Sequence, residues 1–178
     1  MRRAALLIAG IASLSLSAGT WAFEPDTSDE LQLDVARAII DIKKADPGIE
    51  KFFEGAAGYA VIPKVGKAGI GVGGAYGKGL VIVGEKAVGR TTLSQVTVGF
   101  QLGGQVYSQF IFFKDAAALQ TFQRGNFEMG AQASAVAVTL GASADADYDK
   151  GVAVFTNVGG GLMYEATISG QKFKYEAL

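Results

Sequence analysis

The sequence of 178 residues contains no cysteine and no histidine. Without cysteine the chain cannot form a disulfide, a thiolate metal site or the lipid-modified cysteine of a bacterial lipoprotein. Without histidine the usual catalytic triads and zinc sites are excluded, and only carboxylate, lysine, tyrosine or serine chemistry remains. No pair of these groups shows a diagnostic spacing. We therefore expect a protein that is not an enzyme and that has no metal site, no catalytic residues and no cofactor.

The sequence also lacks an apolar run long enough to cross a bilayer as a helix, which takes about 20 residues. The apolar stretch Ala4–Leu16 has 13 residues, follows two arginines and precedes a run of small residues. This pattern predicts a cleavable signal peptide over residues 1–22, with the mature chain starting at Phe23. Cleavage after Ala18 and an uncleaved anchor are the alternatives. We expect a periplasmic or secreted protein.

Charge is scarce and unevenly distributed. Without the two leader arginines, 14 of the 16 basic residues remain against 17 acidic ones, a net charge near −3 that argues against nucleic acid as a partner. Residues 24–50 hold eight acids, whereas residues 51–90 hold six basic residues. Among the latter, Lys64, Lys67 and Lys78 lie between glycines and small residues, where a phosphate headgroup can approach the backbone. Solvated lysines that protect a strand-rich surface are the alternative.

Helical periodicity is confined to residues 27–55. The tetrapeptide that starts at Thr27 matches a capping box, in which Thr27 caps the helix and Glu30 reaches back to it. Apolar residues then recur at helical spacing, and an Asp-Pro-Gly turn ends the helix. A short second helix is expected over residues 49–54, where two phenylalanines can dock it on the rest of the domain.

Residues 56–178 are predicted to be mainly β-structure, because glycine and β-branched residues replace the helical pattern. Asp115 is a good N-cap for one short helix near residues 115–124, before Gly125. Strands are predicted at 59–62, 80–83, 96–102, 106–113, 127–140, 162–168 and 173–175. Twelve glycines between residues 66 and 104 indicate closely packed backbones or a sharply bent sheet.

Two short motifs match the patterns of known binding sites only in part. Residues 69–74 match the GxGxxG string of dinucleotide sites, but the sequence that follows cannot form the helix on which the pyrophosphate would lie. Three alternating aspartates at 145–149 are similar to the start of a calcium loop. Lys150 stands where that loop needs its turn glycine, and Thr156 where it needs a glutamate. A solvated loop is favoured there.

Three segments resemble the SYLF domain family. The first is Ile62–Gly79, IPKVGKAGIGVGGAYGKG; the others are Gly99–Gly103, GFQLG, and Gly161–Tyr164, GLMY. Together they span nearly the whole mature chain in order. Eukaryotic members of this family are known for binding phosphoinositide-containing membranes and, in some cases, actin filaments. Bacterial members are exported proteins of poorly defined role.

The resemblance implies a single SYLF-like domain over residues 23–178. Its fold class would be α+β, with N-terminal amphipathic helices packed on a glycine-rich, curved antiparallel β-sheet or partly closed barrel. We expect a non-catalytic, envelope-associated module that binds an anionic lipid or membrane surface through Lys64, Lys67 and Lys78. The alternative is an envelope protein-interaction or structural factor without lipid dependence. Two features depart from the family: the first helix is acidic where eukaryotic members are basic, and Glu165 replaces a usual glycine.

Overall fold

The computed structural model of the chain describes residues 23–99, 104–131, 133–158 and 168–178. The predicted signal peptide therefore lies outside the described residues. Most of the two shorter family motifs lies outside them as well: Gly99–Gly103 from its second residue, and the whole of Gly161–Tyr164. Glu165 also lies outside the described residues. The strand predicted at 162–168 lies in the same undescribed stretches except for its last residue, and the strand predicted at 96–102 does so from residue 100 onward.

Helix α1 spans Glu30–Ala45, and its N-cap is Asp29. The Asp29 carboxylate accepts a hydrogen bond from the backbone N–H of Leu31 at 2.9 Å, which satisfies one of the free donors of the first turn. The prediction that Thr27 caps this helix is therefore wrong. Both residue types are good caps, and the tertiary contacts of the chain select the aspartate.

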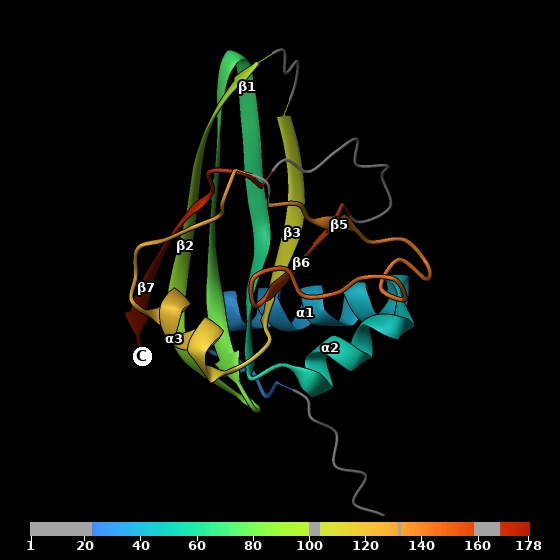
Figure 1. The fold of residues 1–178 in the computed structure, drawn as a ribbon. Coiled ribbons are helices and arrows are strands. Elements are labelled where there is room, and N and C mark those ends of the chain that lie inside the picture. The colour runs from blue at the N-terminus through green and yellow to red at the C-terminus, as the bar shows by residue number, and fades with distance from the viewer. Residues whose placement is uncertain (1–22, 100–103, 132, 159–167) are drawn as a thin grey trace, which may run out of the picture.

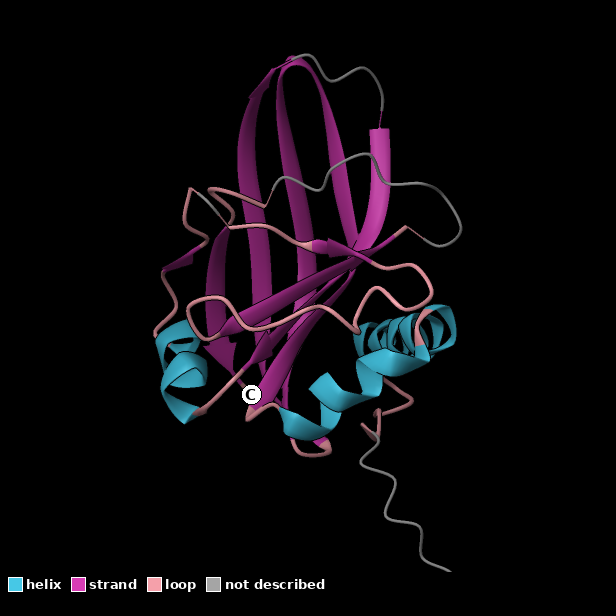
Figure 2. Ribbon diagram, turned by 45° about the vertical axis from the view of Figure 1, so that its right-hand side comes forward, coloured by secondary structure: helices cyan, strands magenta, loops and turns pink. Residues whose placement is uncertain are grey.

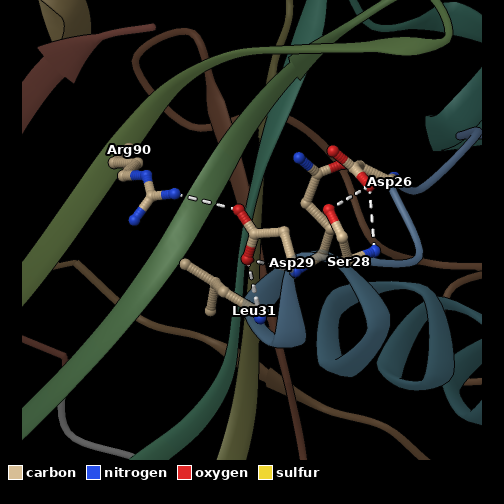
Figure 3. A network of polar contacts seen from close by, with 6 residues as sticks. Asp26, Ser28, Asp29, Leu31 and Arg90 are labelled. Carbon is tan, nitrogen blue, oxygen red and sulfur yellow. Dashed lines mark hydrogen bonds and ion pairs between the residues drawn. The ribbon is translucent and has the colours of Figure 1, made fainter.

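Those contacts are shown in Figure 3. The carboxylate of Asp26 accepts hydrogen bonds from the N–H and the hydroxyl of Ser28, so Thr27 and Ser28 form a turn ahead of the helix. The second carboxylate oxygen of Asp29 pairs with the guanidinium of Arg90 at 2.9 Å. The same aspartate thus caps α1 and fastens its first turn to the sheet.

Two further helical segments follow α1 directly: a 3-10 turn, η1 (Pro47–Ile49), and α2 (Glu50–Gly55). Both phenylalanines of α2 are buried against the sheet, as the sequence predicts. The ring of Phe52 lies 4.8 Å from that of Phe155, and the ring of Phe53 lies 4.9 Å from that of Phe112. These edge-on contacts dock α2 on two neighbouring strands.

The strands form one sheet in the order β4-β7-β2-β1-β3-β6-β5. Their bounds are β1 Gly58–Val83, β2 Lys86–Gly99, β3 Gly104–Phe113, β4 Phe127–Glu128, β5 Val136–Ala137, β6 Val152–Asn157 and β7 Lys172–Ala177. Among these strands, neighbours pair antiparallel except for the short parallel pair β5–β6. The helices lie against the lower part of this curved sheet while its strands project upward (Figures 1 and 2). The predicted α+β class is confirmed.

The structure differs from the predicted elements in three places. The strands predicted at 59–62 and 80–83 are the two ends of one long strand, β1. The strand predicted at 127–140 is wrong, since that stretch holds only the two-residue strands β4 and β5 with turns between them. Strand β6 has no counterpart in the prediction. By contrast, α3 (Ala116–Gln123) forms as expected, with the Asp115 carboxylate accepting from the N–H of Ala118 at 2.9 Å.

Two apolar clusters lie on opposite faces of the sheet. We call the face that packs against α1 and α2 the helix side; its cluster also includes Leu80, Ile82, Phe110 and Phe112. The concave side includes α3 and the alternate residues of the same strands, such as Val81, Ile111 and Phe113. Side chains alternate between the two faces along a strand. A residue next to a cluster member therefore lies on the opposite side of the sheet, and a residue two positions away lies on the same side.

Candidate functional site

The glycine-rich segment of β1 folds back on itself at Gly71, which has a φ of +75° (Figure 1). The first arm pairs with β3 and the second with β2. The fold is so sharp that a Cβ on Gly79 would overlap the carbonyl oxygen of Val61 on the opposite arm. A Cβ on Gly77 would lie 2.9 Å from the carbonyl oxygen of Lys64. Glycine is therefore required on the concave side of this bend.

Lys64 lies on the helix side of the first arm. Its ammonium pairs with the carboxylate of Asp34 on α1 at 2.7 Å, although the lysine side chain stays largely exposed. Lys78 lies on the same side of the second arm, because it is two residues before Leu80 of the helix-side cluster. It is exposed. The structure thus places these two predicted site residues on one side of the sheet.

Lys67 lies on the other side. It follows Val65 of the concave-side cluster by two residues and pairs with Gln105 of β3. It is half-buried. The three lysines therefore surround the two arms of β1 and do not form a single patch, and their role in binding stays a prediction.

Sequence reasoning passed over a fourth lysine. Lys174 of β7 pairs with Thr92 of β2, which pairs in turn with Lys78. With strands about 4.8 Å apart, the backbones of the two lysines lie about 10 Å from one another. Lys174 is exposed and lies on the helix side, because its neighbour Phe173 belongs to the concave-side cluster. Only the strand order could reveal this proximity, since 95 residues separate the two lysines.

Acidic residues are missing from the long strands. No Asp or Glu occurs between Glu54 and Glu85, or between Glu85 and Asp115. The strands β1, β2 and β3 consequently carry basic charges only. The five charged residues of these strands all lie on β1 and β2, so this part of the sheet is net positive although the chain as a whole is slightly acidic.

Large apolar side chains are exposed at the projecting end of the same strands. Ile70 is 82% exposed and Val96 is 80% exposed, while Val72, Tyr76 and Val106 are each more than half exposed. Val96 belongs to the strand predicted at 96–102, whose first four residues lie in β2. The described helices stop short of this end of the sheet (Figure 2).

A groove of about 780 Å³ runs between α1 and the sheet. Its charged lining comes from Asp34, Asp41, Arg37, Lys44 and Lys64. Arg37 shares the Asp34 carboxylate with Lys64, at 3.3 Å. The groove therefore offers both signs of charge, unlike the projecting end.

The concave side holds a buried amide network. The side chains of Gln109 and Gln171 exchange hydrogen bonds of 2.7 and 3.2 Å, and Gln171 also donates to Tyr107. Burial raises the pKa of Tyr107 to about 12, despite the opposing hydrogen bond from Gln171. Burial likewise raises the pKa of Tyr59. Both phenols stay protonated at neutral pH, and the network connects β7 to β3 across the concave side.

Asp46, at the end of α1, is buried and anchors a distant loop. Its carboxylate accepts from the N–H groups of Ser143 at 2.7 Å, Gly48 at 3.1 Å and Gly141 at 3.3 Å. Burial by itself raises the pKa of Asp46, but these hydrogen bonds outweigh burial and lower the pKa below its ordinary value. The groups that surround this carboxylate are peptide donors, as suits a structural clamp.

Within the described ranges, no three acidic side chains lie close enough together to hold a metal ion, the aspartates at 145–149 included. None of the described helices is long and apolar enough to cross a membrane.

Comparison with known proteins supports the resemblance seen in the sequence. A family model described as Ysc84, Las17-binding protein actin regulator, matches residues 94–176. Beta cell expansion factor A of Aeromonas veronii is 28% identical over 155 residues, which cover 84% of this chain and 59% of that protein. The chain thus matches little more than half the length of this relative. With the helices and curled sheet described above, these matches agree with the resemblance to SYLF-domain proteins, although the Ysc84 model covers slightly less than half of the chain.

Proposed function

We propose that this protein is an exported, non-catalytic module that binds anionic lipid surfaces through the lysines of its glycine-rich segment. The observation that carries the proposal is the absence of acidic residues from β1, β2 and β3, whose charged side chains are all basic. Exposed cations on strands that carry no carboxylates of their own attract anionic headgroups, although Asp34 of α1 competes for Lys64.

The contact would be mainly electrostatic. Each basic residue near an anionic membrane contributes about 1 kcal/mol, so Lys64, Lys67 and Lys78 together contribute about 3 kcal/mol. Lys64 would exchange the carboxylate of Asp34 for a headgroup phosphate, which lowers its net contribution. Lys174 lies close enough to Lys78 to join the contact from the helix side.

The non-catalytic part of the proposal rests on the chemistry of the buried polar groups. Asp46 is saturated by peptide donors, and the amides of Gln109 and Gln171 bond to one another. Tyr107 is held protonated at neutral pH. These groups are satisfied by structural contacts, which leaves none of them poised for proton transfer or nucleophilic attack.

A second candidate is an envelope protein-interaction factor without lipid dependence. The groove beside α1 favours it, because its paired acids and bases suit a polypeptide better than a uniformly anionic surface. The matching family model is described as a Las17-binding protein actin regulator, which also names a protein partner. Lipid dependence of binding separates the two candidates.

The proposal is tested by vesicle cosedimentation of the wild type and of two charge-matched variants. In the first variant Lys64, Lys67 and Lys78 are replaced by Gln. In the control, three exposed lysines at the opposite end of the long strands from the fold-back, Lys86, Lys114 and Lys150, are replaced by Gln. We expect the first variant to lose about a hundredfold in partitioning to anionic vesicles, the equivalent of about 3 kcal/mol.

The control variant has the same net charge and should lose much less. Equal losses in the two variants would show that binding depends on net charge alone. Unchanged binding of the first variant would remove Lys64, Lys67 and Lys78 from the site.

A further inference from the structure

The projecting end of the sheet consists of the β1 fold-back and the adjoining end of β2. The type of side chain at this end changes with distance from Gly71. At about 3.3 Å per residue, Ile70 and Val72 lie within about 3 Å of the turn. Val96, which pairs with Gly74, lies within about 10 Å. Of the described side chains at this end, the two nearest the turn are therefore aliphatic and exposed.

Charged and phenolic side chains begin only behind this aliphatic layer, although Thr97, which pairs with Gly73, brings one hydroxyl to within about 7 Å of the turn. Lys67 lies about 13 Å from the turn, and Tyr76 about 17 Å. Lys64 and Lys78 follow at about 23 Å, on opposite arms of the fold. The order along the strands is thus aliphatic, then lysine and tyrosine, then lysine, and these strands carry no acid of their own. The structure places a carboxylate in the last layer, that of Asp34 of α1, which pairs with Lys64.

We propose that the projecting end inserts into the headgroup–acyl boundary of an anionic bilayer, with the β1 fold-back entering first. Ile70, Val72 and Val96 lie among the upper acyl chains, Lys67 and Tyr76 lie at headgroup level, and Lys64 and Lys78 face the anionic surface. This inference rests on the proposed function and adds to it an insertion element and an orientation. It also explains why lysines on both sides of the sheet contribute, since an end-on sheet meets the membrane with both.

The shape of this end favours a bilayer over a protein partner. Protein hot spots are packed and centred in recessed pockets, whereas these aliphatic residues occupy a projecting end. Interfacial elements bury their apolar residues about 5–10 Å deep and keep tyrosine and basic residues at the headgroups. The spacing of Ile70, Val72, Val96 and Tyr76 matches that depth.

Tryptophan fluorescence tests the insertion directly. Trp21 is the only tryptophan in the sequence and belongs to the predicted signal peptide, so the mature chain from Phe23 offers a background free of indole. Ile70→Trp is then introduced at the fold-back, and Ile40→Trp at an exposed position of α1 as the control. The vesicles contain equal parts phosphatidylcholine and phosphatidylglycerol, with and without bromine on the upper acyl chain.

We expect the emission of Ile70→Trp to shift to shorter wavelength and to be quenched by the bromine, with Ile40→Trp unaffected. A second variant, Ile70→Ser with Val72→Ser, should lose about tenfold or more in partitioning while keeping its salt dependence, because it removes apolar burial and no charge.

The failures are distinguishable. If the protein binds these vesicles but Ile70→Trp is neither shifted nor quenched, the insertion is overturned and the proposed function stands. Equal quenching of Ile70→Trp and Ile40→Trp also overturns the orientation. If the wild type binds neither anionic nor neutral vesicles, both proposals are overturned, and a protein partner becomes the occupant to seek.

Discussion

The substitution Gly79→Ala tests why β1 is rich in glycine. The added methyl group would overlap the carbonyl oxygen of Val61 and lie 2.9 Å from both Cα and Cγ1 of Ile62. Two of these three atoms belong to the backbone of the opposite arm, so no change of rotamer can relieve the contact. The two arms of the fold-back would have to separate.

The cost follows from that geometry. Overpacking by a methylene in a packed region costs about 1–3 kcal/mol, and the backbone contacts place Gly79→Ala at the upper end of this range. The matched control is Gly66→Ala on the first arm, where a Cβ meets no atom within 4 Å. Alanine restricts the unfolded chain more than glycine, so we expect the control to be neutral or up to about 1 kcal/mol more stable.

Urea unfolding, followed by circular dichroism, measures the difference. With a slope of about 2 kcal/mol per molar urea, Gly79→Ala should lower the unfolding midpoint by about 1.5 M, and Gly66→Ala should leave it unchanged or raise it. Coincident midpoints for the two variants would refute the argument that close approach of the arms selects glycine.

Three further predictions concern the rest of the chain. Ile39→Ala should lower the free energy of unfolding by about 2–4 kcal/mol without weakening lipid binding, because Ile39 is buried on the sheet side of α1; unchanged stability with lost lipid binding would instead assign it to the membrane. Asp46→Ala should cost about 1.5–3 kcal/mol at pH 7 through lost hydrogen bonds. Folding lowers the pKa of Asp46, so this stabilisation is complete above about pH 4 and is lost as the pH falls through the pKa of the folded state. The urea midpoints of the wild type and of Asp46→Ala should therefore converge in acid, and a constant gap would contradict the assignment. N-terminal sequencing of the exported protein should start at Phe23, and a chain that retains Met1 would contradict export.

The sequence predicted best those elements whose signals are local. The cap at Asp115 and the buried apolar pair Leu119 and Phe122 define α3 within eight residues, and the structure confirms this helix. The apolar stripe of α1 could also be identified from the sequence, because its residues recur at helical spacing. Its cap could not, because the choice of Asp29 over Thr27 depends partly on Arg90, which is 61 residues away.

Long-range features escaped the sequence for a similar reason. The glycine content of β1 indicated a bend or close packing, but it could not show that Gly79 faces Val61 or that one strand forms both arms. Likewise the three lysines could be named from composition, whereas their distribution over two sides of the sheet follows from registers with β2 and β3. The proximity of Lys174 to Lys78 depends on the strand order alone.

The most direct test of the proposed function needs only the wild-type protein, cosedimented with vesicles of pure phosphatidylcholine and with vesicles that contain equal parts phosphatidylglycerol. Binding should require the anionic lipid and should weaken steeply between about 0.1 M and 1 M salt, as the Debye length falls from about 10 Å to about 3 Å. Equal binding to both kinds of vesicle, or binding that salt leaves unchanged, would contradict an anionic-surface module held by Lys64, Lys67 and Lys78.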